Sequence, residues 1–295
     1  MYEIVTFTYG TELEFADVDI TNILPEGCQW NKKDYSIVNS NGVANDPLGK
    51  TCKYGGEINT KPTSTISEQV SVVKEIINIL YPEPVINYKC NLHIHIGIPG
   101  LKEDLSMMKQ IYSYAYNMDE RVFDIIDPMP VPIKLNSEDS KLEAKRYHRN
   151  LISHRKKPTA KRFAEILAST TPQEFFENHA TKDKNRKLCW AITPRDGINL
   201  RQLWETGTIE FRHFFGTLDL EEIRSCLIWC SEFLNLAIND PITPPQIILK
   251  NNPNLKFPKS AKFDADLQRG YNLTNIAHHN RKQAMENIKR WLANK

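Results

Sequence analysis

The chain has 295 residues, with 38 Lys and Arg against 36 Asp and Glu, so its net charge is +2 when the eight His are neutral. Apolar residues make up 40% and charged residues 25%, which excludes a disordered chain, a collagen-like chain and a coiled coil. A chain of this length can bury one large core, or at most two.

The sequence has no apolar run of about 18 residues, so we expect no transmembrane helix. Residues 1–10 lack a basic segment followed by an apolar core, so we expect no signal peptide and a cytoplasmic protein. The cysteines form no CxxC pair, which argues against a disulfide framework. Cys226 and Cys230 share a predicted helix face, either as small buried hydrophobes or as a metal pair.

Strands dominate the first 64 residues. Leu13 and Phe15 alternate with polar neighbours, which predicts an extended strand in which Gly10 marks a bend or a close approach. Residues 16–64 are rich in Asn, Gly, Asp and Pro, and predict antiparallel strands that include 35–38 and 54–59.

The hydrophobic period then changes to that of a helix. Thr65 and Glu68 form a capping box, and Pro82 ends the helix that follows. The strict alternation of residues 91–98 predicts a strand. The later predicted elements are, in chain order, a helix at 102–126, a short helix at 172–179, a strand pair at 197–215, a helix capped by Asp219 and a last helix at 279–293.

Strands and helices alternate irregularly, and the strands have the pattern of half-buried ones. That pattern favours an α+β fold around an antiparallel sheet over a doubly wound parallel sheet. We expect one catalytic domain over 1–240, with a polar, basic insertion at about 134–162. Residues 241–295 are expected to form a Pro-rich surface wrap and a terminal helix, packed on the same domain.

Three of the strand segments carry acids or imidazoles on alternate positions, which point to the same face of a sheet. In the first, Glu12 and Glu14 lie side by side, roughly 6.5–7 Å apart. Two carboxylates this close repel each other unless a cation lies between them, and their separation suits two neighbouring Mg²⁺ ions. The alternative is the solvated face of an amphipathic strand.

The second segment places His93 and His95 on one face. One imidazole could ligate a metal while the other binds a phosphate, and an HxH strand also occurs in zinc hydrolases. Alternatively, these are two hydrogen-bonded histidines at a sheet edge. In the third segment Glu210 and Arg212 share a face, either as a salt bridge or as a metal ligand beside an anion clamp.

Together the three segments predict an acidic metal pocket beside a phosphate clamp. This combination suits phosphoryl transfer from a nucleotide, where catalysis depends on positioning and on charge neutralisation. The sequence has no GxxxxGK[ST] and no GxGxxG motif, so a P-loop or Rossmann site is not indicated.

The chain resembles the amidoligase family, which is related to glutamine synthetase and glutamate–cysteine ligase. The resemblance spans about 10–225 and rests on GTELEF, DYS, GGEINTKP, NLHIHIG, PRDGIN and GTIEFRHFFGTLD, in that order. It implies a glutamine-synthetase-like antiparallel sheet that cups the active site, with helices on the outer face. It also implies ATP and two or three Mg²⁺ ions, with Mn²⁺ as an alternative metal.

The resemblance assigns roles to individual residues. Glu12, His93 and Glu210 resemble the ligands of the metal nearest the ATP phosphates. Glu14 and Glu57 resemble ligands of a second metal nearer the substrate. By the same resemblance, His95 contacts a phosphate or the substrate. Arg195 and Arg212 resemble the arginines that bind the transferred phosphoryl group and the substrate carboxylate. Asp34 would deprotonate the amine.

Two positions of the matched motifs stand apart. Asn199 belongs to the PRDGIN motif but has no role that we can assign. Asn91 stands where the family leads us to expect Gly, and we expect this change to alter only local backbone freedom.

The resemblance therefore implies an ATP- and Mg²⁺-dependent carboxylate–amine ligase, whose substrates are small-molecule or peptide acids and amines. The segment 145–162 has eight Lys or Arg and no Asp or Glu, so it could bind a polyanion, close over ATP phosphates, or form a solvated surface. Two rival functions are a nucleic-acid-binding protein on a degenerate ligase scaffold and a zinc hydrolase that uses His93 and His95.

Overall fold

The fold is that of a mixed α+β protein built on one antiparallel sheet. The computed structural model describes residues 6–16, 18, 23–31, 37, 44–45, 51–52, 55–80, 84, 86, 90–126, 158–179 and 197–258. The sheet has six strands in the order β2-β5-β1-β6-β8-β7, and every neighbouring pair is antiparallel. Its strands are β1 (Thr8–Ala16), β2 (Gln29–Asn31), β5 (Gly55–Asn59), β6 (Asn91–Gly97), β7 (Ile198–Asn199) and β8 (Thr208–Phe215).

The expected α+β class and antiparallel sheet are thus confirmed. A separate two-stranded sheet pairs β3 (Ala44–Asn45) with β4 (Thr51–Cys52). β1 continues through Gly10, which pairs with His95, so Gly10 does not end the strand. The predicted strand at 35–38 and the predicted helix at 279–293 lie outside the described residues, except for residue 37.

One face of the sheet is apolar and packs on helices. Leu13 pairs with Leu92, and Ile94 pairs with Phe211, so side chains opposite each other across the strands share this face. Phe211 and Phe214 both make edge contacts with the Trp229 ring of α7. These apolar residues belong to the single large core cluster among the described residues.

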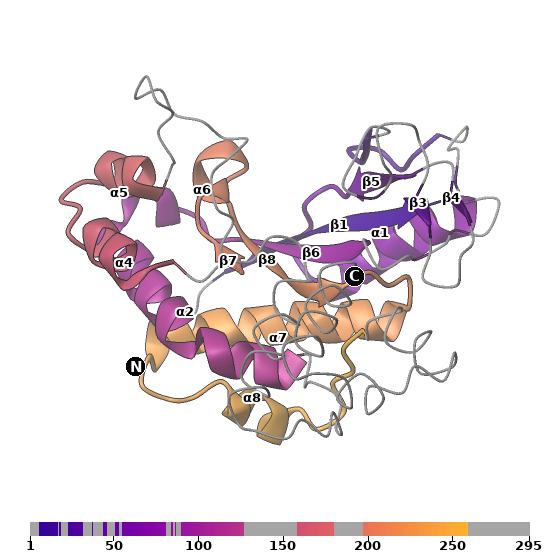
Figure 1. The fold of residues 1–295 in the computed structure, drawn as a ribbon. Helices are drawn as coiled ribbons and strands as arrows, with labels where there is room; N and C mark the ends of the chain where they lie inside the picture. The colour runs from indigo at the N-terminus through magenta and orange to yellow at the C-terminus, as the bar shows by residue number, and fades with distance from the viewer. Residues whose placement is uncertain are drawn as a thin grey trace, which may run out of the picture.

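Three long helices cover this apolar face. α7 (Leu220–Asn239) and α2 (Leu105–Ile126) lie beneath the sheet in Figure 1, and α1 (Ile66–Ile79) packs against α7 and β1. The predicted capping box is present at the start of α1, where Thr65 accepts from the Glu68 N–H and Glu68 accepts from the Thr65 N–H. Asp219 caps α7 as expected, through the N–H groups of Glu221 and Glu222.

The remaining helices are short. They are η1 (Leu101–Glu103), α4 (Ala160–Leu167), α5 (Pro172–His179), α6 (Gln202–Glu205) and α8 (Gln246–Asn251). The residues of α5 were predicted as a helix. α6 lies on the opposite side of the sheet from α7 (Figure 1).

Three of these helices occupy segments for which the sequence predicted none. α4 begins inside the polar, basic segment 134–162, α6 lies inside the predicted strand pair at 197–215, and α8 interrupts the Pro-rich segment that begins at 241. Residues 240–258 pack on the sheet and its helices rather than forming a loose linker. Phe257 stacks on Phe214, and the Tyr114 hydroxyl donates to the Thr243 carbonyl oxygen at 2.8 Å.

Cys226 and Cys230 are buried in α7 as free thiols, and burial raises the pKa of both. Neither belongs to a three-ligand group in the described part of the chain, which favours the small-hydrophobe interpretation. Among the described helices, none combines the length and the apolar character that a membrane span requires.

Candidate metal centre and active site

The face of the sheet opposite α7 carries the polar side chains. Residues that are paired across antiparallel strands point to the same face, so the register itself gathers them. Glu12 of β1 pairs with His93 of β6, and Glu210 of β8 pairs with His95 of β6. Four adjacent strands from β1 to β7 therefore contribute to one polar surface, which Asn199 of β7 extends by pairing with Glu210.

Three of these side chains form a group that could hold a metal ion. One ligand atom each from Glu12, His93 and Glu210 lies within 4.8 Å of the other two. Nδ1 of His93 lies 2.6 Å from Oε2 of Glu12 and 3.5 Å from Oε1 of Glu210. These are the three residues that the family resemblance assigned to one metal, and the fold brings them together from strands far apart in the sequence.

Electrostatics keeps this group in the protonation states that a metal needs. Burial lowers the pKa of His93, and so does the nearby Arg212 charge, so the imidazole favours its neutral form. Burial tends to raise the pKa of Glu12, but the charge on His95 and the contacts with both histidines outweigh it and lower this pKa well below its usual value. A neutral imidazole and an ionised carboxylate are the ligand forms of these side chains.

Glu210 is fully buried and is fixed on both of its oxygens. Arg212 donates through Nη1 to Oε1, and Asn199 donates through Nδ2 to Oε2 at 2.7 Å. Burial works to raise the pKa of Glu210, but the positive charge of Arg212 dominates and the net shift is downward. Glu210 therefore forms the buried ion pair of the first alternative, and it also belongs to the group of three residues that could hold a metal ion.

His95 lies at the edge of the group rather than in it. Its Nδ1 is 2.8 Å from Oγ1 of Thr208, and its Nε2 is 2.9 Å from Oε1 of Glu12. The second contact is an ion pair at hydrogen-bonding distance. Burial acts to lower the pKa of His95, yet the Glu12 carboxylate more than offsets it and the pKa is raised.

Glu14 and Glu57 face each other across β1 and β5. Oε2 of Glu14 accepts from the Asn91 backbone N–H at 2.6 Å and from the Asn91 amide at 2.9 Å. Oε1 of Glu57 accepts from the Asn59 amide at 2.6 Å. The expectation that Asn91 affects only backbone freedom is therefore wrong, because its side chain binds a candidate metal ligand.

A β-bulge shapes the end of the site. Leu92 pairs with Phe214 and Ile94 pairs with Phe211, so β8 has one more residue than β6 between the two pairs. The extra residue lies in the Arg212–His213 segment, and bulges of this kind re-aim side chains. The His213 ring lies against Gly197, where a Cβ atom would come within 2.5 Å of Nε2.

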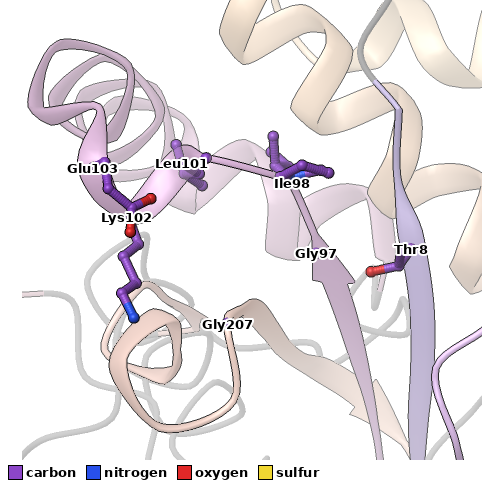
Figure 2. Close-up of a pocket in the computed structure, with 9 residues that line it drawn as sticks. Thr8, Gly97, Ile98, Leu101, Lys102, Glu103 and Gly207 are labelled. Atoms are coloured by element: carbon purple, nitrogen blue, oxygen red, sulfur yellow. The ribbon is translucent and has the colours of Figure 1, made fainter.

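A cavity of about 230 Å³ lies at the end of the sheet beyond His95 (Figure 2). It is lined by Thr8 of β1, Gly97 at the end of β6, Gly207 before β8, and the residues of η1. Figure 2 shows the Lys102 side chain extending toward the loop that carries Gly207. Gly97 follows His95 by two residues, which places the cavity next to the polar surface.

The donor set and its surroundings fit a divalent cation. Two carboxylates and one imidazole are ligands that Mg²⁺, Mn²⁺ and Zn²⁺ accept in proteins. Nε2 of His93 is buried and lacks a hydrogen-bond partner among the described residues, which is costly for a polar atom. The nearby carboxylates of Glu12 and Glu210 carry the negative charge that a divalent cation would neutralise.

The family comparison covers His93 and Glu210 of this group, whereas Glu12 lies before the matched residues. A family model described as a putative amidoligase enzyme matches residues 31–234. The chain belongs to this family. Comparison with curated proteins and with solved structures gives no match to the chain.

Two residues predicted for the amidoligase site, Asp34 and Arg195, lie outside the described residues, so their roles stay predictions. Residues 145–157 of the basic segment also lie outside the described residues, and its three alternatives stay open. Sequence reasoning gave no role to Asn199, which binds Glu210, and did not single out Thr208, which binds His95. Asn199 is paired with Glu210 across β7 and β8, and Thr208 lies two residues before Glu210 in β8. That proximity to a predicted site residue was the available signal.

Proposed function

We propose that this amidoligase is an ATP- and Mg²⁺-dependent carboxylate–amine ligase that works through an acyl phosphate. The observation that carries the proposal is the group of Glu12, His93 and Glu210 in a chain of this family. The group has an Arg at its edge and a cavity beside it, which suits a nucleotide triphosphate better than a neutral ligand.

The proposed reaction has two steps. An oxygen of the substrate carboxylate attacks the γ-phosphorus of ATP, the bond to the β-phosphate oxygen breaks, and ADP leaves. The amine nitrogen then attacks the acyl carbon, the carbon–oxygen bond to phosphate breaks, and the amine loses a proton to a base. The products are an amide or isopeptide bond, ADP and inorganic phosphate.

Glu12, His93 and Glu210 would hold a divalent cation. Such an ion neutralises negative charge on the γ-phosphoryl group. Glu14 and Glu57, paired on the same face, are the proposed ligands of a second cation. Mn²⁺ can replace Mg²⁺ in oxygen-rich sites of this kind.

The side chains near the phosphates have distinct proposed tasks. Arg212 keeps Glu210 ionised and adds positive charge beside the transferred group. His95, whose pKa the Glu12 carboxylate raises, is proposed to bring its positive charge close to a phosphate oxygen, and the cavity beyond it is proposed to receive the nucleoside part of ATP. Arg195 is proposed to hold the substrate carboxylate, and Asp34 is proposed to accept the amine proton.

The test uses pooled carboxylic acids and amines with ATP and Mg²⁺. We expect release of ADP and phosphate that depends on both an acid and an amine. With acids labelled by ¹⁸O in the carboxylate, one labelled oxygen should appear in the phosphate. Release of AMP and pyrophosphate, or phosphate without label, would contradict the acyl-phosphate mechanism.

Matched variants tie the activity to the site. Glu12→Gln should abolish ADP release, since it removes a ligand charge while keeping the shape of the side chain. Glu165→Gln makes the same chemical change on the exposed surface of α4 and should leave activity unchanged. Zinc retained by the purified protein, together with hydrolysis that needs no ATP, would instead favour the zinc-hydrolase alternative.

A further inference from the structure

The side chain of Asn91 has two features that the family motif does not explain. It is buried at the first position of β6, two residues before the ligand His93. Its backbone N–H and its amide nitrogen both donate to the same carboxylate oxygen, Oε2 of Glu14, at 2.6 and 2.9 Å.

Two donors on one oxygen fix the rotation of the Glu14 carboxylate. A carboxylate that accepts from a single donor can turn about its last side-chain bond, whereas two donors from one residue hold its plane. The other oxygen, Oε1, then faces Nε2 of His93 at 3.9 Å. Asn91 therefore decides which oxygen of Glu14 faces the candidate metal centre.

His93 uses its two ring nitrogens in opposite directions. Nδ1 faces Glu12 and Glu210, while Nε2 faces Glu14. Metal-ligating histidines usually present their second ring nitrogen to a carboxylate, which orients the ring and strengthens its donor atom. Glu14 occupies the position of that carboxylate, although 3.9 Å is longer than a hydrogen bond.

We propose that Asn91 is a positioning residue of the metal centre, which holds the Glu14 carboxylate so that its Oε1 faces His93 and the cation. The inference rests on the metal site of the proposed function, but not on ATP turnover. It is compatible with Glu14 as a ligand of the second cation, because a carboxylate that binds a cation is itself oriented by hydrogen-bond partners.

The test is Mn²⁺ binding measured by EPR on the full chain without nucleotide. Asn91→Ala keeps the backbone N–H and removes only the amide, so one of the two donors to Glu14 remains. Partners behind metal ligands typically contribute 10–100-fold to affinity, so we expect about tenfold weaker Mn²⁺ binding with unchanged stoichiometry. Asn91→Asp keeps the shape but faces Glu14 with a second carboxylate, and should weaken binding further.

Glu14→Gln tests whether Asn91 acts through Glu14. Weaker Mn²⁺ binding, or loss of one Mn²⁺ per chain as expected for a ligand of the second cation, supports the proposal, whereas Mn²⁺ binding equal to that of the parent would overturn it. Equal Mn²⁺ affinity in the parent and in Asn91→Ala would also overturn the proposal. Thermal unfolding of each variant shows whether a change in affinity reflects lost folding instead, in which case Asn91 is only structural.

The outcomes also distinguish this proposal from the proposed function. A parent protein that binds no Mn²⁺ contradicts both. A parent that binds Mn²⁺ through Asn91 but releases no ADP with any acid and amine contradicts the ligase while leaving the positioning role supported.

Discussion

Arg212 and Glu210 lie two residues apart on β8, and the guanidinium donates to the carboxylate in a fully buried ion pair. The pair also belongs to the candidate metal centre, because Glu210 is one of the three residues that could hold a metal ion. The proposed function therefore couples stability and activity at Glu210, and its variants need both measurements.

Glu210→Gln should destabilise the fold as well as abolish turnover. It removes the carboxylate to which the buried Arg212 donates, and breaking a buried ion pair in this way costs about 3–5 kcal/mol. Urea denaturation should show this loss. In the double variant Glu210→Gln/Arg212→Met, stability should recover substantially without any return of activity, and a double variant as unstable as the single one would contradict this account.

Thr208→Val should raise the KM for ATP with a smaller effect on folding. The substitution keeps the shape of the side chain but removes the hydroxyl that binds Nδ1 of His95. A hydrogen bond to a charged group contributes about 1.5–3 kcal/mol, so a KM increase of about tenfold or more is expected if His95 loses its hold on phosphate. Thr208→Ser retains the hydroxyl and should restore most of the parent KM; a variant as impaired as Thr208→Val would argue against the hydrogen bond.

Gly97→Ala should weaken ATP binding without weakening Mn²⁺ binding. A Cβ atom at this position would clash with Oγ1 of Thr8, the residue across from it in β1, and would alter a wall of the cavity. Isothermal titration with ATP and EPR with Mn²⁺ measure the two effects separately. Gly100 lines the same cavity and has φ of 76°, so Gly100→Ala would strain the backbone and cannot serve as its control.

Gly97→Ala in a Thr8→Ala background is the matched control, because Thr8→Ala removes the clashing hydroxyl. Partial recovery of ATP affinity in that double variant would assign the defect to the steric contact. Equal ATP affinity in the parent and in Gly97→Ala would place the nucleoside elsewhere.

His179 should make the fold less stable as the pH falls from neutral. Burial lowers the pKa of its imidazole to about 4, and the Arg162 charge adds to this, although the Phe175 carbonyl oxygen opposes it. In the unfolded chain the pKa of His is near 6.5. Between pH 6.5 and pH 4 the unfolded chain therefore binds more protons than the folded chain, so the free energy of unfolding decreases as the pH decreases. The difference between the two pKa values corresponds to a loss of about 3 kcal/mol in the free energy of unfolding by pH 4.

The measurement is urea denaturation at pH 7 and at pH 4.5, in the parent and in His179→Phe. The ring of His179 packs among Tyr112 and Phe175, so Phe suits the site in shape and removes the titrating group. Other groups also titrate in this range, but they are common to both proteins. The variant should lose less stability than the parent on acidification, and identical losses would exclude His179 as the cause.

Local signals in the sequence were sufficient for much of the fold. The capping box at Thr65, the alternation in β6 and the Asp219 cap each depend on residues close in the chain, and all three form as predicted. α8 was missed because its six residues follow two prolines and are too few to show a helical period.

The candidate site was predictable in part for the same reason. Alternation along a strand predicts which side chains share a face, and this places Glu12 with Glu14 and His93 with His95. Alternation does not predict the register of the strands. The register pairs His93 with Glu12 and His95 with Glu210. The Asn91–Glu14 contact depends on residues 77 positions apart, so no local pattern could indicate it.

The extra residue in β8 limits how the length of this strand can change. Phe211 and Phe214 both face Trp229, although residues three apart in a regular strand point to opposite faces. Deleting one residue between them would restore regular pairing and keep both rings on α7. Only one position would then remain for the side chains of Arg212 and His213. The shortened strand would lose either the guanidinium that keeps Glu210 ionised or the imidazole that lies against Gly197.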